Sequence, residues 1–391
     1  MIEVLNNQIP LIETYDATNP QVRLFPLTEP TSGLSALYDS ALIDKNVWYC
    51  MFTTENSFKI VDIKKVMGET IYNMVMNKEA SIVLDIPFEP FLKAIDAVYE
   101  DIVLKLGIPS SQIIFSSNMY DAKAYNDQVA ERFDLPPIRI FYFSALEWML
   151  NKYPGPIPNT LSLKQYDKKF LNLNRRWRTH RPLLVLLMYH QKLLDKGFVS
   201  FGPADEEYYN TWERIWGGLK CSTWQNTKVF NAVIESENIK EMPSLYLDTD
   251  ELRTNRAELT DSTNRYYEDS YFSVISETTF YNDDRTQNSR FITEKTFKAI
   301  MMNHPFIIVS IPRSLEVLKD LGYKTFSPWI NESYDQETND LDRMLMIVEE
   351  IKRLANLPAD ELEAFLIATK EICSYNYNIL KNKTTFIYEQ Q

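Results

Sequence analysis

Glycine is scarce in this chain, at 9 of its 391 residues. The sequence holds neither Gly-x-Gly-x-x-Gly nor a Walker loop, the glycine-rich turns that cradle phosphates in dinucleotide-binding proteins and P-loop ATPases. No apolar run approaches the roughly 20 residues that a membrane-spanning helix needs. These absences count against a dinucleotide oxidoreductase, a P-loop ATPase and a membrane-spanning protein.

Cysteine and histidine are equally scarce, with three of each. They are Cys50, Cys221, Cys373, His180, His190 and His304. An odd number of widely separated cysteines favours reduced thiols over a disulfide framework, and neither set has the spacing of metal ligands. The first residues also lack the basic and apolar segments of a leader peptide. We therefore expect a cytoplasmic protein with no obligatory metal; Asp248 and Asp250, in a polar stretch, are the alternative metal candidate.

Positive charge is also in short supply, because 41 Lys and Arg face 54 Asp and Glu, a net charge of −13. A general electrostatic grip on nucleic acid needs clustered Lys and Arg, so this balance counts against it. One local exception stands out, a basic cluster formed by Lys168, Lys169, Arg175, Arg176, Arg178 and Arg181.

What the chain does contain is an alternation of strands and helices. In the first part, short apolar runs predict strands over 47–52, 81–85, 112–116 and 138–142, and apolar spacing predicts a helix over 88–106. This order predicts a parallel sheet with helical crossovers. Ligands of such sheets bind at the carboxyl ends of the strands, where Asp85, Glu89 and Asn118 fall. Ordinary turn and capping chemistry is the alternative reading of these three residues.

A proline-rich segment over 153–158 breaks the pattern, because three prolines in five residues cannot continue a helix or a central strand. We place the domain junction there. The sequence thus predicts an N-terminal domain over 1–155, a C-terminal domain over 165–370, and a helix end and tail over 371–391.

The second part repeats the alternation. Strands are predicted over 169–174, 197–201, 271–277 and 306–309, with another starting at 324–326; helices are predicted from 182 to 194, from 294, from 312, over 341–354 and over 359–372. A polar stretch over 203–265 has a Trp-rich helix at 206–219. Thr293 is suited to cap the helix that starts at Glu294.

This part brings charged side chains to strand and helix ends. Arg175, Arg178 and Arg181 follow one strand, Glu277 ends another, and Glu294 and Lys295 open a helix. Guanidinium groups and helix N-termini suit diphosphate oxygens, and a carboxylate accepts sugar hydroxyls. The alternatives are a solvated helix start and arginines that pair with the protein's own carboxylates.

Two segments carry a resemblance to known families. Residues 291–295, Phe-Ile-Thr-Glu-Lys, resemble the Tyr-(Val/Ile)-Thr-Glu-Lys segment of the α-1,3-fucosyltransferases, with Phe291 in place of tyrosine, so that hydroxyl is lost. Residues 291–335 are similar to glycosyltransferase-like proteins of large phages and giant viruses. So are residues 170–175 and 178–181, which match their Phe-Leu-x-Leu-Asn-Arg strand and Arg-x-His-Arg loop.

The resemblance implies a GT-B-type glycosyltransferase, an α/β protein with two Rossmann-like domains facing a cleft. It implies an inverting enzyme that uses a nucleotide sugar as co-substrate, located in the host cytoplasm if the chain is viral, with a C-terminal helix that returns to the first domain. The donor-binding residues would be Asn174, Arg175, Arg178, Arg181, Glu277, Glu294 and Lys295. Asp85 and Glu89 are the candidates for the catalytic base.

Two alternatives stay open at this point. The acceptor is either a glycan or protein hydroxyl, or a hydroxymethylated base of phage DNA, and the acidity of the chain counts against DNA. The second alternative is a binding or structural protein that has kept the fold without catalysis, because fold alone does not establish activity.

Overall fold

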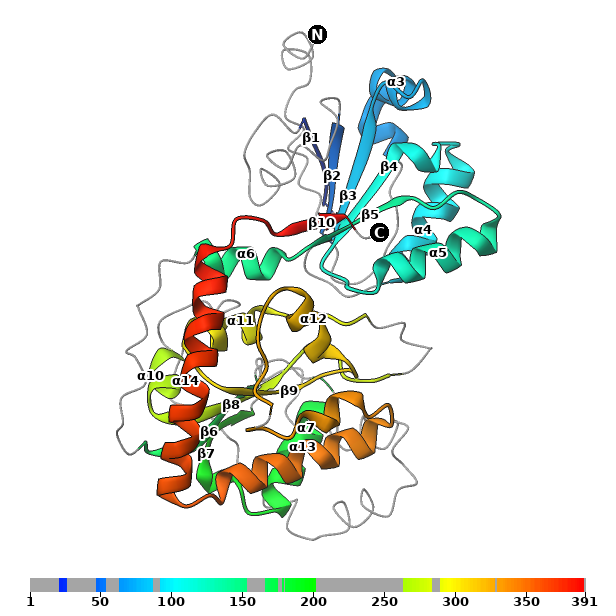
Figure 1. Ribbon diagram of the computed structural model, residues 1–391. Coiled ribbons are helices and arrows are strands. Elements are labelled where there is room, and N and C mark those ends of the chain that lie inside the picture. Colours follow the sequence, from blue (N-terminus) through cyan, green and yellow to red (C-terminus); the bar gives the residue numbers. More distant parts are fainter. Residues whose placement is uncertain are drawn as a thin grey trace. The chain divides into compact units, whose positions relative to one another are not determined.

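The computed structural model describes residues 21–26, 47–53, 63–86, 92–152, 166–174, 178, 180–201, 263–282, 289–327 and 329–389. Its strands form two separate sheets, and the chain divides into two compact units (Figure 1). Unit 1 comprises Met1–Trp148, Asp283–Phe291 and Lys383–Gln391; unit 2 comprises Met149–Asn282 and Ile292–Asn382. The expected α/β class with parallel sheets is confirmed.

The sheet of unit 1 has the order β1-β2-β3-β4-β5-β10. Its strands are β1 (Gln21–Pro26), β2 (Val47–Thr53), β3 (Ser81–Ile86), β4 (Ile113–Ser117), β5 (Arg139–Phe143) and β10 (Ile387–Glu389). The four strands from β2 to β5 run parallel in chain order, as the alternation predicted. β1 and β10 pair antiparallel at the two edges.

Helices of unit 1 pack on an apolar core. They are α3 (Ile63–Met76), α4 (Lys93–Ala97), a π-helical segment (Val98–Lys105) and α5 (Ala122–Phe133), followed by α6 (Ala145–Lys152), which runs into unit 2. The helix predicted over 88–106 therefore begins at Lys93 in the described residues and widens into π-helix. Ile95 and Ile102 on it are fully buried, with Phe115 of β4 in the same core.

The described strands of unit 2 all run parallel, in the order β7-β6-β8-β9. They are β6 (Lys168–Asn174), β7 (Gly197–Phe201), β8 (Ser270–Ser276) and β9 (Phe306–Val309). The chain leaves β6 towards β7 on one side, whereas β8 leads to β9 on the other. The sheet therefore has a topological switch between β6 and β8, the place where open α/β sheets bind ligands.

Six helices belong to the described part of unit 2. They are α7 (His180–His190), α10 (Asn264–Glu268), α11 (Glu294–Met301), α12 (Ser314–Asp320), α13 (Asp340–Ala355) and α14 (Ala359–Asn382). α7 packs against α13, and α11 packs against the long α14 (Figure 1). None of the described helices is long and apolar enough to cross a membrane.

The C-terminal part differs from expectation in two places. The strand expected from Lys324 is wrong, because side chains bind that backbone: Asn376 bonds both the N–H and the C=O of Lys324, at 2.8 Å each, and the Glu332 carboxylate accepts from the N–H of Phe326. Conversely, the polar tail contains the strand β10. The proline-rich segment and the helix expected over 206–219 lie outside the described residues.

Candidate functional site

The candidate site lies in unit 2, at the carboxyl edge of β6 and β8. Arg181, in the first turn of α7, is buried at 3% exposure, and its Nη2 donates to the carbonyl oxygens of Ser276 (3.1 Å) and Glu277 (3.4 Å). Its backbone N–H donates to the carbonyl of Arg178, whose own side chain is exposed. The α7 start is thereby held against the end of β8.

His180 supports the same junction. Its Nε2 lies 3.0 Å from the carbonyl oxygen of Glu277, and its ring stacks on Phe280 at 5.3 Å between centroids. Burial, ahead of the positive charge of Arg181, lowers the pKa of His180 well below the usual histidine value. The imidazole is therefore neutral, with Nε2–H as the donor to the carbonyl, since a carbonyl oxygen only accepts.

Glu277 holds the start of α11. Its carboxylate is fully buried; Oε1 accepts from the Thr293 N–H (3.0 Å) and the Thr296 hydroxyl (2.6 Å), and Oε2 accepts from the Thr293 hydroxyl (2.5 Å). The N–H groups of a first helical turn have no partner inside the helix, and an anion there also interacts favourably with the helix dipole. Both carboxylate oxygens of Glu277 are thus engaged by the protein.

Glu294 and Lys295 form a half-buried ion pair at the start of α11. Lys295 Nζ lies 2.7 Å from Glu294 Oε1 and 3.1 Å from the Thr293 hydroxyl. Burial by itself would raise the pKa of Glu294, but the charge of Lys295, the hydrogen bond from it and the charge of Arg181 outweigh burial and lower that pKa. At neutral pH Glu294 is ionised, within the electrostatic reach of both cations.

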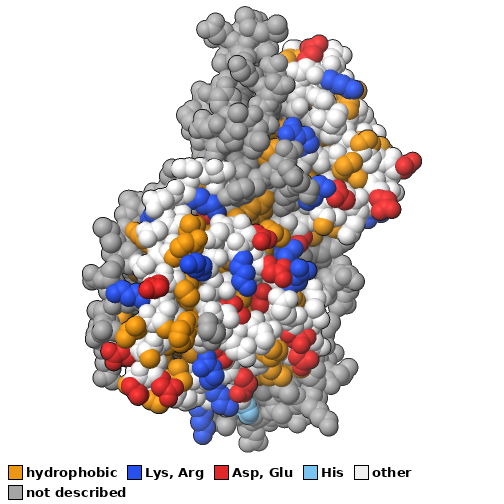
Figure 2. Space-filling view, in the orientation of Figure 1, with side chains coloured by type: hydrophobic (Ala, Val, Ile, Leu, Met, Phe, Trp, Pro, Cys, Tyr) orange, Lys and Arg blue, Asp and Glu red, His pale blue; other side chains and the backbone are white. Residues whose placement is uncertain are grey.

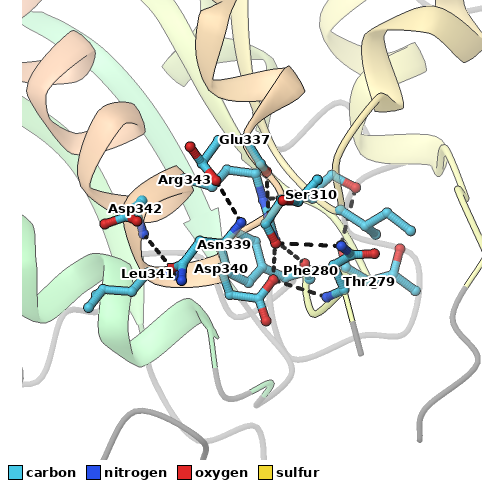
Figure 3. Close-up of polar contacts among 12 residues, drawn as sticks. Thr279, Phe280, Ser310, Glu337, Asn339, Asp340, Leu341, Asp342 and Arg343 are labelled. Carbon is cyan, nitrogen blue, oxygen red and sulfur yellow. Dashed lines mark hydrogen bonds and ion pairs between the residues drawn. The ribbon is translucent and has the colours of Figure 1, made fainter. Parts of the chain in front are cut away.

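Hydrogen bonds from Arg343 hold the loop after β8 in place (Figure 3). This buried guanidinium donates to the carbonyl oxygens of Phe280 (2.5 Å), Ser310 (3.0 Å) and Glu337 (2.9 Å), and pairs with Asp340 at 2.6 Å. The sequence analysis missed Arg343. The available signal was an arginine on the apolar face of α13, in line with Ile347 and Ile351.

Of the other predicted site residues, the structure describes Asn174 completely and Asp85 only in its backbone. Asn174 ends β6 and is buried at 3% exposure, beside the same edge. Asp85 lies in β3 of unit 1, in register with Ser116, and its side chain is not among those described. Glu89, Arg175 and the pair Asp248 and Asp250 lie outside the described residues.

Acidic and histidine side chains do not gather elsewhere in the described chain as a metal site would need. Among those residues no group of three or more His, Cys, Asp or Glu is arranged to hold an ion. The residues that the structure places at the site are Arg181, Glu277, Glu294 and Lys295, together with the starts of α7 and α11.

Comparisons with known proteins give little. No family model matches the chain, and no curated protein matches it. Among solved structures it is similar to a mutant of S. aureus TarM in complex with fondaparinux, alpha-GlcNAc-glycerol and UDP, with 14% identity and a TM-score of 0.31. The match covers 78% of this chain and 51% of that one, so the chain spans about half the length of the structure it matches. A likeness this slight carries no argument about activity.

Proposed function

We propose that this protein is a glycosyltransferase that binds a nucleotide sugar in unit 2 and transfers the sugar to an acceptor hydroxyl. One observation supports the proposal above the others. Arg181 bonds the carbonyl of Glu277, and the carboxylate of the same Glu277 holds the helix start that carries Glu294 and Lys295, although more than a hundred residues separate Arg181 from Lys295. These residues lie at the carboxyl edge of a parallel sheet, beside its topological switch. The resemblance of residues 291–295 to the fucosyltransferases points the same way.

The proposed roles follow from charge. Arg178, Arg181 and Lys295 offset the negative charge that develops on the departing diphosphate, a stabilisation that is strong where water is excluded. Glu294, held ionised by its two neighbouring cations, accepts hydrogen bonds from sugar hydroxyls. Glu277 acts through others, since it fixes the start of α11, and His180 fixes the end of β8. In this scheme no metal is needed to offset the leaving charge.

The acceptor side of the reaction rests on unit 1. A base there, Asp85 or Glu89, would take the proton from the acceptor hydroxyl as its oxygen bonds to the sugar carbon and the bond from that carbon to the diphosphate breaks. Attack opposite the departing diphosphate would invert that carbon. A glycan or protein hydroxyl fits the charge of the chain better than hydroxymethylated DNA. On the described part of the face in Figure 2, Lys and Arg are interspersed with Asp and Glu, whereas DNA binding favours a continuous basic surface.

A second candidate function is a binding or structural role without catalysis. The observation in its favour is that Lys295 already pairs with Glu294, and that Arg181 bonds carbonyl groups of its own chain. Thermal unfolding in the presence of nucleoside diphosphates separates the two. Stabilisation by one of them supports a donor site, whereas unchanged unfolding temperatures across the set support the second candidate.

The replacement Lys295→Ala tests the catalytic role. We expect single-turnover transfer to slow by about 10²–10³-fold, because the variant removes one cation from the leaving phosphate. The circular dichroism spectrum should not change, since the side chain lies at a helix start and adds little to the core. Lys319→Ala, an exposed lysine of α12, is the matched control and should transfer sugar at the wild-type rate. A wild-type transfer rate in Lys295→Ala would show that the start of α11 is only a solvated helix cap with no role in transfer.

Glu294→Gln tests the binding role. The neutral amide is a weaker acceptor for sugar hydroxyls than the carboxylate, so we expect the dissociation constant of the donor to rise, by about tenfold for one charged hydrogen bond. Equilibrium donor binding and single-turnover transfer should be measured on the same samples. Unchanged donor affinity would remove Glu294 from the site.

A further inference from the structure

The central strand of unit 2 carries two buried amides. Asn172 and Asn174 lie on β6, between β7 and β8, and are 0% and 3% exposed. Residues two apart on a strand point to the same face, so the two side chains are neighbours. Interior strands of parallel sheets are covered on both faces and are mostly apolar, and buried polar groups there are costly unless they are hydrogen-bonded.

Hydrogen bonds fix which way each amide points. Asn172 Nδ2 donates to the carbonyl oxygen of Val274 at 2.7 Å, and because a carbonyl only accepts, that end of Asn172 must be the NH2 group. Its Oδ1 therefore faces Asn174 and accepts from Asn174 Nδ2 at 2.5 Å. It follows that the other end of the Asn174 amide is Oδ1, an acceptor.

That acceptor has no donor in the described chain. Asn174 Oδ1 is inaccessible to water and receives no hydrogen bond from any residue that the structure describes. The Asn174 backbone, by contrast, is engaged, with its N–H donating to the Ser200 hydroxyl at 3.1 Å. A buried acceptor without a donor is rare in folded proteins and calls for an explanation.

The amide pair is continuous with the candidate site. Asn172 Nδ2 also lies 3.4 Å from the Ser276 hydroxyl, and the carbonyl of the same Ser276 accepts from Arg181. Asn174 itself is the last residue of β6, at the switch between β6 and β8. A ligand in the crevice of an α/β sheet meets the ends of these two strands.

We propose that Asn174 Oδ1 accepts a hydrogen bond from the nucleoside of the bound donor, from a ribose hydroxyl or a base N–H, and thereby selects which nucleotide binds. Asn172 is a positioning residue, because its bond to Val274 presents Oδ1 of Asn172 to Asn174 Nδ2, which leaves Asn174 Oδ1 as the end of that amide that the described chain does not engage. This inference rests on the proposed function. It adds to it a determinant of nucleotide specificity that the charged residues do not supply, since their partners are phosphates and sugar hydroxyls.

The test is calorimetric titration of the full-length protein with UDP, GDP and ADP. For the nucleotide that wild type binds, Asn174→Ala should raise the dissociation constant about tenfold, the value of one hydrogen bond of this kind. The 2′-deoxy nucleotide and the nucleotide methylated on its base N–H should then be compared. Wild type should bind more weakly the analogue that lacks the hydroxyl or N–H group that donates to Asn174 Oδ1. Asn174→Ala should bind that analogue and its parent nucleotide equally.

Two variants separate recognition from structure. Asn376→Ala removes another buried asparagine of unit 2, both ends of which bond the backbone of Lys324; it should lower the unfolding temperature and leave nucleotide affinity unchanged. Asn172→Leu frees the Asn174 amide to rotate. It should therefore reduce the difference in affinity between the parent nucleotide and the analogue that lacks the hydrogen-bonding hydroxyl or N–H group.

The outcomes are distinct. If no nucleoside diphosphate binds to wild type, the proposed function fails and this inference fails with it. If wild type binds one, and Asn174→Ala binds it equally tightly, the inference alone is overturned. The inference alone is also overturned if Asn174→Ala raises the dissociation constants of the parent nucleotide and of the analogue without the hydrogen-bonding group by the same factor.

Discussion

His304 of unit 2 is buried against β8 and is neutral. Its Nε2 donates to the Ser270 carbonyl at 2.8 Å, so Nδ1 is the acceptor for the Ser273 hydroxyl at 2.7 Å. Burial, only partly offset by the bond to Ser270, lowers the pKa of His304 from its usual 6.5 to about 4. The pKa of Asp335 is shifted in the opposite direction. Burial raises this pKa from 3.8 to about 6, while the carboxylate accepts from the N–H of Leu315.

These two groups should give unit 2 opposing pH dependences in one window. Between pH 6.5 and 4 the unfolded chain protonates His304 and the folded chain does not, so its contribution to stability is lost as the pH falls, by about 3 kcal/mol in full. For Asp335 the folded chain holds the proton more tightly, so its contribution is present below pH 3.8 and is lost as the pH rises to about 6.

Paired variants separate the contributions. In urea unfolding between pH 7 and 4.5, His304→Gln should become more stable on acidification relative to wild type, because the Asp335 contribution is then unopposed. Asp335→Asn should lose stability more steeply than wild type over the same range, and its amide oxygen still caps α12. Parallel pH profiles for wild type and both variants would contradict this account.

For single residues, local contacts were predictable from the sequence, whereas contacts between distant elements were not. Thr293 as the cap of α11 was predictable, since its chemistry is local, and its hydroxyl does accept from the Lys295 N–H. Glu277 was predicted to be a donor-binding residue, and in the structure its carboxylate oxygens accept from Thr293 and Thr296. A carboxylate at a strand end can serve a ligand or a neighbouring helix, and only the packing of α11 against β8 decides between them.

At the scale of elements, α13 is tied to the sheet by an arginine on its buried face. Arg343 supplies donors to three carbonyl oxygens of separate segments, after β8, after β9 and before α13 (Figure 3). Ten residues along the same helix, Arg353 pairs with Glu350 in a half-exposed position. The two arginines share a helix and a charge but differ in burial.

Replacing each arginine by methionine should therefore have unequal effects. Arg343→Met leaves three carbonyl groups without this donor and Asp340 without this cation, although Asp340 still accepts from the N–H of Asn282; breaking a buried pair of this kind costs about 3–5 kcal/mol. Arg353→Met should cost less, because the Arg353 guanidinium is half exposed and its buried partner Glu350 still accepts from the N–H of Asn331. Urea unfolding measures both, and hydrogen exchange at Phe280 should rise in Arg343→Met alone. Equal losses of stability would show that burial of Arg343 is unimportant.

Element prediction succeeded where periodicity governs and failed where distant side chains decide. The strands β6, β8 and β9 were predicted within a residue or two; β9 is a continuous apolar run, whereas apolar residues of β6 and β8 are interspersed with Asn and Ser. The segment from Lys324 has strand-like composition, but Asn376 and Glu332 occupy its backbone groups. β10 lies in a polar tail and becomes a strand because the edge of β5 is available to it.

At the scale of the whole molecule, unit 1 is assembled from three stretches of chain. Besides its first 148 residues it contains Asp283–Phe291 and Lys383–Gln391. An ion pair joins each added stretch to the first: Arg290 to Asp121 at 2.5 Å, and Lys383 to Glu147 at 2.6 Å. The resemblance implied that a C-terminal helix returns to the first domain; the returning segment that the structure describes is β10, after α14 ends at Asn382.

The Lys383 pair should matter more than its position near the end of the chain suggests. The Glu147 side chain is 0% exposed and that of Lys383 is 11% exposed, so this pair is buried. Lys383→Met keeps the apolar stem but leaves the Glu147 charge without that cation, at a cost of about 3–5 kcal/mol. Lys352→Met, in an exposed pair with Glu349, should change stability by less than about 1 kcal/mol.

A double variant decides whether charge or packing is responsible. In Lys383→Met with Glu147→Gln the buried charge is gone, so most of the stability lost in Lys383→Met should return, giving a coupling energy well above the roughly 0.5 kcal/mol of independent sites. Hydrogen exchange should locate the effect: faster exchange in β5, which β10 covers, and unchanged exchange in β6 and β8 of unit 2. Additive losses in the double variant, or equal exchange changes in both units, would mean that the tail is not anchored through this pair.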